Sequence, residues 1–247
     1  MLKINLFIVG AQKCGTSALA EFLSTHPDIC LVKDKEAHIF DRDDIGKLTL
    51  NDIDKAYGEL LPHYNKESVC CDATPLYMFY PDIPSQLADY NSSAKLIVLL
   101  RDPAERALSQ YYMEKRRGSE PLSFGSALLA EKRRLNEDMD ALDLDSAWRR
   151  YSYRSRGYYS HQLNNLYRYF PREQVLVLKN AELLNEHQHT LDKVTSFLEL
   201  ESIKCTAKNI FSGDYKVSVS QRLALSFLRL YYFPEYIRLR LHHGVVF

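Results

Sequence analysis

The sequence predicts an α/β fold, a three-layer and P-loop-like arrangement in which a central parallel sheet is flanked by helices. Three observations predict it. Short apolar, β-branched runs alternate with stretches of helical character, an order typical of a parallel sheet. A glycine-containing loop directly follows the first run. The run KLIVLL at residues 95–100 is continuously apolar after its lysine, as expected of a parallel strand covered on both faces.

Four strands are predicted along the chain. They lie at residues 5–9, within residues 67–75, at residues 95–100 and at residues 174–178. A helix is expected over residues 16–23, because glycine precedes this segment and Pro27 follows its end. In parallel sheets of this kind ligands bind beyond the carboxyl ends of the strands. The loops after Val9, Cys71 and Leu100 are therefore the candidate binding segments.

The composition is that of an ordinary soluble globular protein. Of 247 residues, 46% are hydrophobic and 26% are charged. The 32 Lys and Arg residues balance 32 Asp and Glu residues, so the formal net charge is zero. Because a global positive field is absent, no nucleic-acid partner is predicted.

The cysteines and the hydropathy pattern indicate the cellular compartment in which the protein is expected. Five cysteines show no repeated spacing and no zinc-ligand spacing, which favours reduced thiols and no metal site. No apolar run approaches the roughly 20 residues of a membrane-spanning helix, and no signal peptide precedes the first strand. For a complete chain, the expected location is cytoplasmic. The oligomeric state stays open.

A single domain over residues 1–247 is expected, with two helical additions. The charge-rich segment at about 118–155 is interpreted as a helical insertion, either a solvated one or a lid over the substrate. The segment at about 218–247 is amphipathic and aromatic, and Pro234 is expected to break it. A helix packed on the domain is favoured here over a helix lying on a membrane surface.

The first loop, FIVGAQKCGTS, resembles a phosphate-binding loop with a displaced lysine. Gly10, Gly15 and Ser17 match the pattern G-x-x-x-x-G-K-[ST], but Thr16 occupies the lysine position and Lys13 comes three residues earlier. A strand-loop-helix of this form directs free backbone N–H groups at an anion. A tight turn without a ligand is the alternative. The predicted anion-binding residues are Gln12, Lys13, Cys14, Gly15, Thr16 and Ser17.

A second anion site is predicted where the strand at residues 95–100 ends. Arg101 follows the strand, where a guanidinium is costly unless it meets an anion, and Ser109 follows about two helical turns later. Asp102 is expected to cap the helix rather than to hold magnesium, because Pro103 suits the first helical position. Glu105 and Arg106 are interpreted as a structural surface pair.

With both sites placed, the chain resembles sulfotransferases that use 3′-phosphoadenosine 5′-phosphosulfate (PAPS). Lys13, followed by the Gly15-Thr16 pair, resembles the family's 5′-phosphosulfate loop, and Arg101 with Ser109 resembles its 3′-phosphate motif. Further similarity lies in KDKEAHIFDRD, DATPLY and RGYYSHQLNNLYRYFPREQVLVL. The resemblance covers most of the chain and implies PAPS as the donor, PAP as the leaving product and no metal.

The segment KDKEAHIF at residues 33–40 is similar to the glycan-modifying branch, the heparan sulfate sulfotransferases and their bacterial relatives. The resemblance implies that Glu36 is the general base and that Lys13 stabilises the leaving phosphate. Solvated or structural roles are the alternatives for Glu36 and its neighbours. Candidate substrate-binding residues are Lys35, His38, Tyr77 and Tyr158.

Two departures from that branch stand out. Ala73 occupies a position before the T-P-x-Y element where the glycan enzymes often carry lysine. The family's C-terminal Lys-Gly-Arg loop has no clear counterpart, and FSGDYK at residues 211–216 is the only candidate.

The predicted function is in-line transfer of a sulfuryl group from PAPS to a hydroxyl or amine of a carbohydrate or glycosylated small molecule. Two alternatives are kept. A PAP- or nucleotide-binding protein of the same fold without transferase activity is one, supported by the departures above. A magnesium-dependent P-loop kinase is the other, and it lacks both the lysine at position 16 and a magnesium carboxylate.

Overall fold

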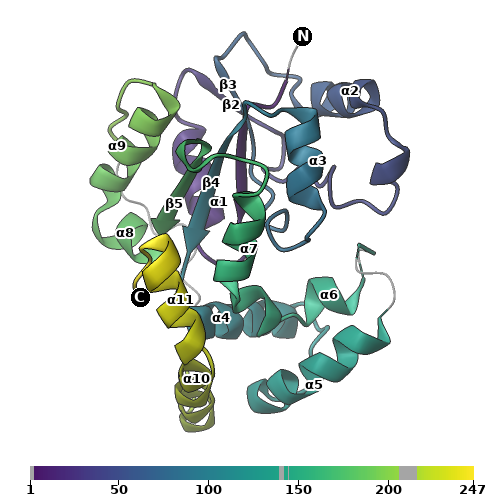
Figure 1. Ribbon diagram of the computed structural model, residues 1–247, viewed down its shortest axis with the longest axis vertical. Helices are drawn as coiled ribbons and strands as arrows, with labels where there is room; N and C mark the ends of the chain where they lie inside the picture. The colour runs from purple at the N-terminus through teal and green to yellow at the C-terminus, as the bar shows by residue number, and fades with distance from the viewer. Residues whose placement is uncertain (1–2, 139–141, 144, 206–215) are drawn as a thin grey trace. The chain divides into compact units, whose positions relative to one another are not determined.

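The computed structural model describes residues 3–138, 142–143, 145–205 and 216–247 (Figure 1). The chain divides into two compact units. The first contains residues 1–100 and 164–211, and the second contains residues 101–163 and 212–247.

A parallel sheet of five strands forms the centre of the first unit. Its strand order is β2-β3-β1-β4-β5, and every neighbouring pair is parallel, which confirms the predicted α/β class. The strands are β1 (Leu6–Gly10), β2 (Ile29–Leu31), β3 (Val69–Asp72), β4 (Lys95–Leu100) and β5 (Val175–Lys179). The sequence predicted four of them and missed β2, whose three residues are too short for a period to be recognised.

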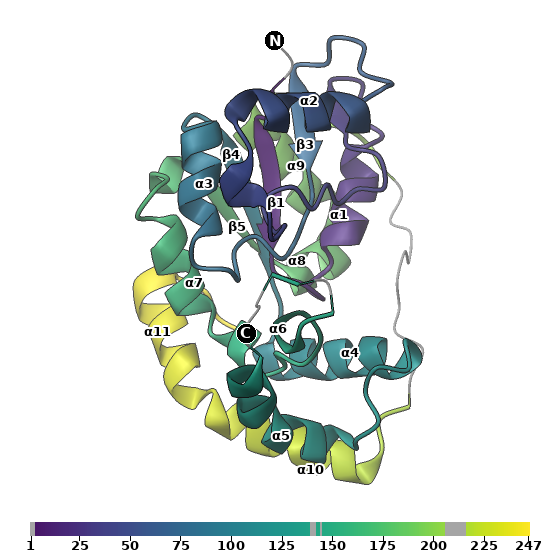
Figure 2. The ribbon, with the colours of Figure 1, turned by 90° about the vertical axis from the view of Figure 1, so that its right-hand side faces the viewer.

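Helices cover both faces of this sheet. One face carries α1 (Thr16–Leu23), α8 (Asn180–Asn185) and α9 (His187–Leu198), and the other carries α2 (Leu50–Leu60) and α3 (Ile83–Tyr90) (Figure 2). Short 3-10 turns lie at η1 (Ile45–Lys47) and η3 (Arg172–Gln174). Because both faces are covered, β1 is buried along its whole length and β4 along all but Lys95.

The sheet has its switch point at β1, which lies between β3 and β4. Strand connections leave β1 towards one edge of the sheet first and towards the other edge later. At such a point the loops at the carboxyl ends diverge and leave room for a ligand. The loop after β1 and the segment after β3 are therefore placed where this fold binds its ligands.

The second unit is helical. It contains α4 (Pro103–Arg116), α5 (Phe124–Glu137), α6 (Ala147–Arg150), the 3-10 turn η2 (Ser155–Gly157), α10 (Val219–Tyr231) and α11 (Phe233–His243). Helix α7 (Tyr159–Leu166) begins in this unit and ends in the first. The expected break near Pro234 is present, since α10 ends at Tyr231 and α11 begins at Phe233. No helix among the described residues is both long and apolar enough to cross a bilayer.

Helix α4 begins as the sequence predicted. The Asp102 carboxylate caps it by accepting a hydrogen bond of 2.9 Å from the Glu105 amide, and Pro103 occupies the first turn. Lys115 and Arg116 lie in its last turn, where positive charge complements the helix dipole. The capping interpretation of Asp102 is confirmed.

The position of Arg106 differs from the one predicted. The sequence placed it in a surface pair with Glu105, but its side chain is fully buried in the second unit. Its guanidinium donates to Gln110 Oε1 at 2.8 Å and to the backbone carbonyl of Tyr153. A buried guanidinium requires such acceptors. Gln110 lies one turn later on α4, but the Tyr153 carbonyl lies 47 residues away along the chain, so the local sequence does not reveal it.

Gly15 is the glycine of the first loop that the backbone requires. Its φ of +96° is one that other residues adopt only under strain, and a Cβ there would lie 2.5 Å from Asn180 Nδ2. We expect Gly15→Ala to lower the free energy of unfolding by about 1–3 kcal/mol. Gly58 lies inside α2, where an added Cβ would meet no atom within 4 Å, so Gly58→Ala should raise it by about 0.5–1 kcal/mol. Urea unfolding of the two variants measures the decrease and the increase. Equal changes in the free energy of unfolding would contradict the requirement for glycine at position 15.

Candidate active site

The loop between β1 and α1 has the geometry of an anion-binding loop. Lys13 has a left-handed φ of 70° and Gly15 one of 96°, so the chain reverses sharply before the helix. Gly15 is the N-cap of α1, and none of the described side chains caps this helix. The first amides of α1 are thereby left as donors for an anion. Thr16 is buried and Ser17 half-buried at the start of the helix.

Lys35 joins this loop to the segment that carries Glu36. Its Nζ donates a hydrogen bond of 2.8 Å to Ser17 Oγ and forms an ion pair with Glu36 Oε1. The contact spans 18 residues of sequence and fixes the Glu36 segment beside the first turn of α1. The structure therefore brings together three of the predicted site residues from two separate motifs.

His38 contacts Glu36 from the other side. The distance from His38 Nε2 to Glu36 Oε2 is 3.2 Å, and the distance from His38 Nδ1 to the fully buried carboxylate of Asp41 is 2.8 Å. Lys35, Glu36, His38 and Asp41 thus alternate positive and negative charge along one chain of contacts. Asp41 was not among the predicted residues, although it lies three residues after His38 in the same motif.

This arrangement shifts two pKa values. Burial raises the pKa of Glu36, but hydrogen bonds from His38 and Lys35 outweigh burial and leave the net pKa below its usual value. Burial lowers the pKa of His38, but its bonds to Asp41 and Glu36 outweigh burial and raise the net pKa to about 9. At neutral pH Glu36 is therefore ionised and His38 is protonated.

The Glu36 segment is supported by the buried carboxylate of Asp72 at the end of β3. Asp72 Oδ1 accepts hydrogen bonds from the Ala37 amide at 3.2 Å and from Thr74 Oγ1 at 2.6 Å. Its Oδ2 accepts from the hydroxyls of Tyr57 at 2.8 Å and Tyr77 at 2.9 Å. Burial raises the pKa of Asp72, while these four donors favour its charged form. Ala37 lies between Glu36 and His38, so Asp72 holds the backbone of both.

Tyr77 and Ala73 have positions that the sequence did not predict. Tyr77 was a candidate substrate-binding residue, but its side chain is fully buried and its hydroxyl accepts from the Ile39 amide at 3.1 Å. Because Tyr77 has no exposed surface, its hydroxyl contacts the Asp72 carboxylate and the backbone of the Glu36 segment and does not face solvent. Ala73 is also fully buried, and its amide donates to the Lys35 carbonyl at 3.0 Å.

Backbone strain is concentrated in the same segment. Asp34, Lys35 and His38 all have left-handed φ values, of 60°, 73° and 51°. Such conformations cost of order 1 kcal/mol each in residues other than glycine. They persist here because hydrogen bonds from the segment after β3 fix the loop. Strained side-chain-bearing residues clustered beside a ligand loop support a functional interpretation of the segment.

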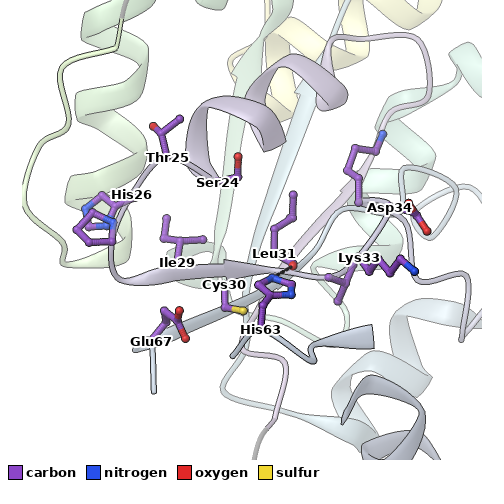
Figure 3. Close-up of a pocket in the computed structure, with 13 residues that line it drawn as sticks. Ser24, Thr25, His26, Ile29, Cys30, Leu31, Lys33, Asp34, His63 and Glu67 are labelled. Atoms are coloured by element: carbon purple, nitrogen blue, oxygen red, sulfur yellow. Dashed lines mark hydrogen bonds between the residues drawn. The ribbon is translucent and has the colours of Figure 1, made fainter. Parts of the chain in front are cut away.

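A pocket of about 500 Å³ lies beside the edge strand β2 (Figure 3). Lys33 and Lys35 line it, as does His63, whose Nε2 lies 3.1 Å from the Leu31 carbonyl oxygen. The remaining lining residues are Ser24, Thr25, His26, Pro27, Ile29, Cys30, Leu31, Val32, Asp34 and Glu67. Because Lys35 also contacts Glu36, the pocket adjoins the Glu36 segment.

Three predicted site residues belong to the second unit. Arg101, the first residue after β4, donates from its guanidinium to Glu105 Oε2 at 3.1–3.2 Å. Ser109 is half-buried on α4. The Tyr158 ring packs against Tyr232 with ring centroids 5.6 Å apart, so at least part of its surface serves the core of this unit. The contribution of all three to a ligand site stays a prediction.

The remaining predictions concern a metal and the C-terminal loop. Within the described ranges, no group of three or more His, Cys, Asp or Glu side chains is arranged to hold a metal ion. Residues 211–215 of the candidate FSGDYK loop lie outside the described residues, and only Lys216 lies within them.

Replacing Asp72 tests its supporting role. Asp72→Asn keeps the shape but replaces one acceptor oxygen with a donor that faces the hydroxyls of Tyr57 and Tyr77. We expect the free energy of unfolding to fall by about 2–4 kcal/mol in urea titrations. The exposed Asp43 provides the matched control Asp43→Asn, which should change it by less than about 0.5 kcal/mol. Equal losses of stability in Asp72→Asn and Asp43→Asn would show that Asp72 does not support the Glu36 segment.

The raised pKa of His38 predicts a pH dependence of stability. Protonated His38 stabilises the fold fully below its unfolded pKa of 6.5, and this contribution is lost as the pH rises to about 9. Because the side chain is 39% exposed, we expect a loss of only roughly 1–2 kcal/mol. His38→Gln should remove this slope in urea titrations at pH 6 and pH 9.5, whereas the exposed His161→Gln should keep it. A slope retained in His38→Gln would contradict the assignment.

Comparison with known proteins identifies the family of the chain. Residues 3–220 match the family model described as "Sulfotransferase domain". The chain is 31% identical over 209 residues to mouse heparan sulfate glucosamine 3-O-sulfotransferase 3B1, a match that covers 85% of this chain and 49% of that protein. The human 3A1 enzyme is also 31% identical, over 212 residues, with 85% and 47% covered. The chain thus spans about half the length of these relatives.

Solved structures show the same fold. The crystal structure of a sulfotransferase from Alicyclobacillus acidocaldarius superposes with a TM-score of 0.78 at 29% identity, covering 97% of this chain and 95% of that one. The crystal structure of mouse sulfotransferase SULT7A1 complexed with PAP has a TM-score of 0.50 at 18% identity, with 92% and 63% covered, and supports the fold alone. Because the family model matches most of its length and a solved sulfotransferase structure superposes on nearly all of it, this chain belongs to the sulfotransferase domain family.

Proposed function

We propose that the protein transfers the sulfuryl group of PAPS to a hydroxyl or amine of a carbohydrate or glycosylated small molecule, with Glu36 as general base. The observation that carries the proposal is the Lys35 bridge, which joins Ser17 of the anion-binding loop to Glu36 through hydrogen-bond and ion-pair contacts. A donor anion held by the loop and an acceptor proton removed by Glu36 are thereby close to each other.

The anion-binding loop suits the donor. Its uncapped helix start and the left-handed Gly15 fit an anionic group held by backbone amides, and Lys13 lies at the apex of the loop. As the sulfur–oxygen bond to the 5′-phosphate breaks, negative charge grows on the phosphate oxygen, and Lys13 with the amides stabilises it. Arg101 and Ser109 are the proposed contacts of the 3′-phosphate.

Glu36 suits the proton transfer. Its lowered pKa keeps the carboxylate ionised at neutral pH, so it is ready to accept the proton of the acceptor as the new sulfur–oxygen bond forms. A weak base is sufficient when bond formation lags behind bond cleavage, because the acceptor proton becomes acidic late in the reaction. Lys35 and His38 hold the two carboxylate oxygens and fix their direction.

The pocket beside β2 suits a polar acceptor. Lys33 and Lys35 supply positive charge and hydrogen-bond donors along its wall, and Asp34 and Glu67 supply acceptors, next to the Glu36 segment. Sugar hydroxyls and acidic substituents are recognised by such groups. The heparan sulfate relatives act on a carbohydrate by their names, and this supports a carbohydrate acceptor here. We also propose a cytoplasmic location, because the five cysteines have no repeated spacing, which favours reduced thiols.

An acceptor screen with sulfur-labelled PAPS tests the proposal. Lys13→Ala should lower kcat about 10²–10³-fold, and Glu36→Gln should lower it by about 10²–10⁴-fold, because each removes one transition-state interaction. The exposed residues Lys47 and Glu21 supply the matched controls Lys47→Ala and Glu21→Gln, which should retain wild-type rates. Unchanged turnover in Lys13→Ala or Glu36→Gln would refute the assigned role.

Nucleotide preference separates the proposal from a kinase. PAP at about 100 times its Kd should stabilise the protein by about 2.7 kcal/mol, measured as a rise in Tm, while ATP with magnesium should not. Arg101→Ala should weaken PAP binding roughly 10–100-fold, since a charge-assisted hydrogen bond to the phosphate is lost. Arg133→Ala is the matched control, because Arg133 also pairs with a glutamate four residues later, at 3.4 Å. A preference for ATP with magnesium would favour the kinase, and PAP binding without transfer to any acceptor would favour a non-catalytic binding protein.

A further inference from the structure

An exposed apolar stripe runs along the last two helices of the second unit. Its members lie three or four residues apart, the spacing that keeps side chains on one side of a helix. Their exposed fractions range from 44% for Ile237 to 75% for Val219. The stripe consists of Val219, Leu223, Phe227 and Leu230 on α10 and of Phe233, Ile237 and Leu241 on α11.

The stripe is separate from the face by which these helices pack. Leu225, Leu228 and Tyr232 are buried in the core of the second unit, and Leu239 is fully buried on α11. One side of these helices is therefore buried, while a second apolar surface remains on the outside. The spacing gives each helix an exposed apolar side, and large exposed apolar surface on a folded domain marks an interaction site.

Charge on the two helices restricts the partner. Residues 219–247 contain four arginines and two histidines but only one acidic residue, Glu235. Glu235 is buried and accepts hydrogen bonds from the Ser160 amide at 2.7 Å and the Ser160 hydroxyl at 2.8 Å. Two of the arginines are paired with carboxylates, Arg229 with Glu105 at 3.1 Å and Arg238 with Glu235 at 3.8 Å. The positive charge that borders the apolar residues therefore comes mainly from Arg222 and Arg240. The whole chain is neutral, so this concentration is local.

We propose that the stripe and its arginines bind the surface of an anionic lipid bilayer, with α10 and α11 lying in the plane of the headgroups. An interfacial helix of this kind buries Phe and Leu side chains at the acyl boundary and sets arginines against lipid phosphates. Arg222 on α10 and Arg240 on α11 border the stripe in helical position. A second copy of the chain fits less well, because pairing two such faces would set arginines against arginines.

Flotation of the full chain with lipid vesicles tests the proposal, in the absence of donor and acceptor so that the result is independent of transferase activity. The protein should float with vesicles of phosphatidylglycerol and phosphatidylcholine in equal parts, and at least ten-fold less with phosphatidylcholine alone. Raising NaCl to 1 M should weaken binding, because salt screens the arginines.

Two double variants and a matched control locate the contact. Phe227→Ser with Leu230→Ser and, separately, Arg222→Gln with Arg240→Gln should each reduce binding to the anionic vesicles by at least ten-fold. Leu129→Ser with Leu184→Ser removes two similarly exposed leucines elsewhere and should leave binding unchanged. Unchanged Tm values of all three double variants would establish that they are folded. If the Phe227→Ser and Leu230→Ser variant has a lower Tm, the Arg222→Gln and Arg240→Gln variant still tests the contact.

Three outcomes would overturn the proposal. The first is an absence of flotation with anionic vesicles. The second is binding that is equal for neutral and anionic vesicles or that survives both double variants. The third is a dimer in sedimentation equilibrium that the Phe227→Ser and Leu230→Ser pair dissociates, which would assign the stripe to self-association.

Discussion

The candidate site depends on one buried carboxylate. Asp72 ends β3 inside the first unit, where a charge without donors would be strongly destabilising, and four hydrogen bonds satisfy it. Two donors are tyrosine hydroxyls from separate segments, one is the neighbouring Thr74, and one is the Ala37 amide. Because the carboxylate requires all of them, the loop containing Glu36 is held to the end of the sheet rather than left as a free surface loop.

The positions of the charged side chains of the site depend on this hydrogen-bonded carboxylate. The fixed Ala37 amide places Glu36 between Lys35 and His38, and Lys35 reaches back to Ser17 at the start of α1. Asp41 balances His38 and raises its pKa, while the two cations lower that of Glu36. The result is an ionised carboxylate of fixed direction, and hydrogen bonds from the segment after β3 offset the strain of its loop.

The two units contribute in different ways. The first unit has the architecture expected of nucleotide-binding α/β proteins, with the ligand loop at the switch point of the sheet. The second unit is built around α4, which begins at the Asp102 cap directly after β4, and around buried polar groups such as Arg106. Its last two helices have apolar residues on two sides, one buried in the core and one exposed.

The fold class, the bounds of α1 and β4, and the motif around Lys13 and Glu36 could all be predicted from the sequence. These follow from local properties: apolar runs, glycine before a helix, a capping aspartate and fixed spacing along the chain. It did not reveal β2, the burial of Arg106, the supporting position of Tyr77, or Asp72 as the centre of the hydrogen-bond network. Those features depend on which distant segments meet, such as Tyr57 with Asp72 and Lys35 with Ser17. The folded chain is needed to find these contacts, because the partners of a buried polar group can come from any part of the chain.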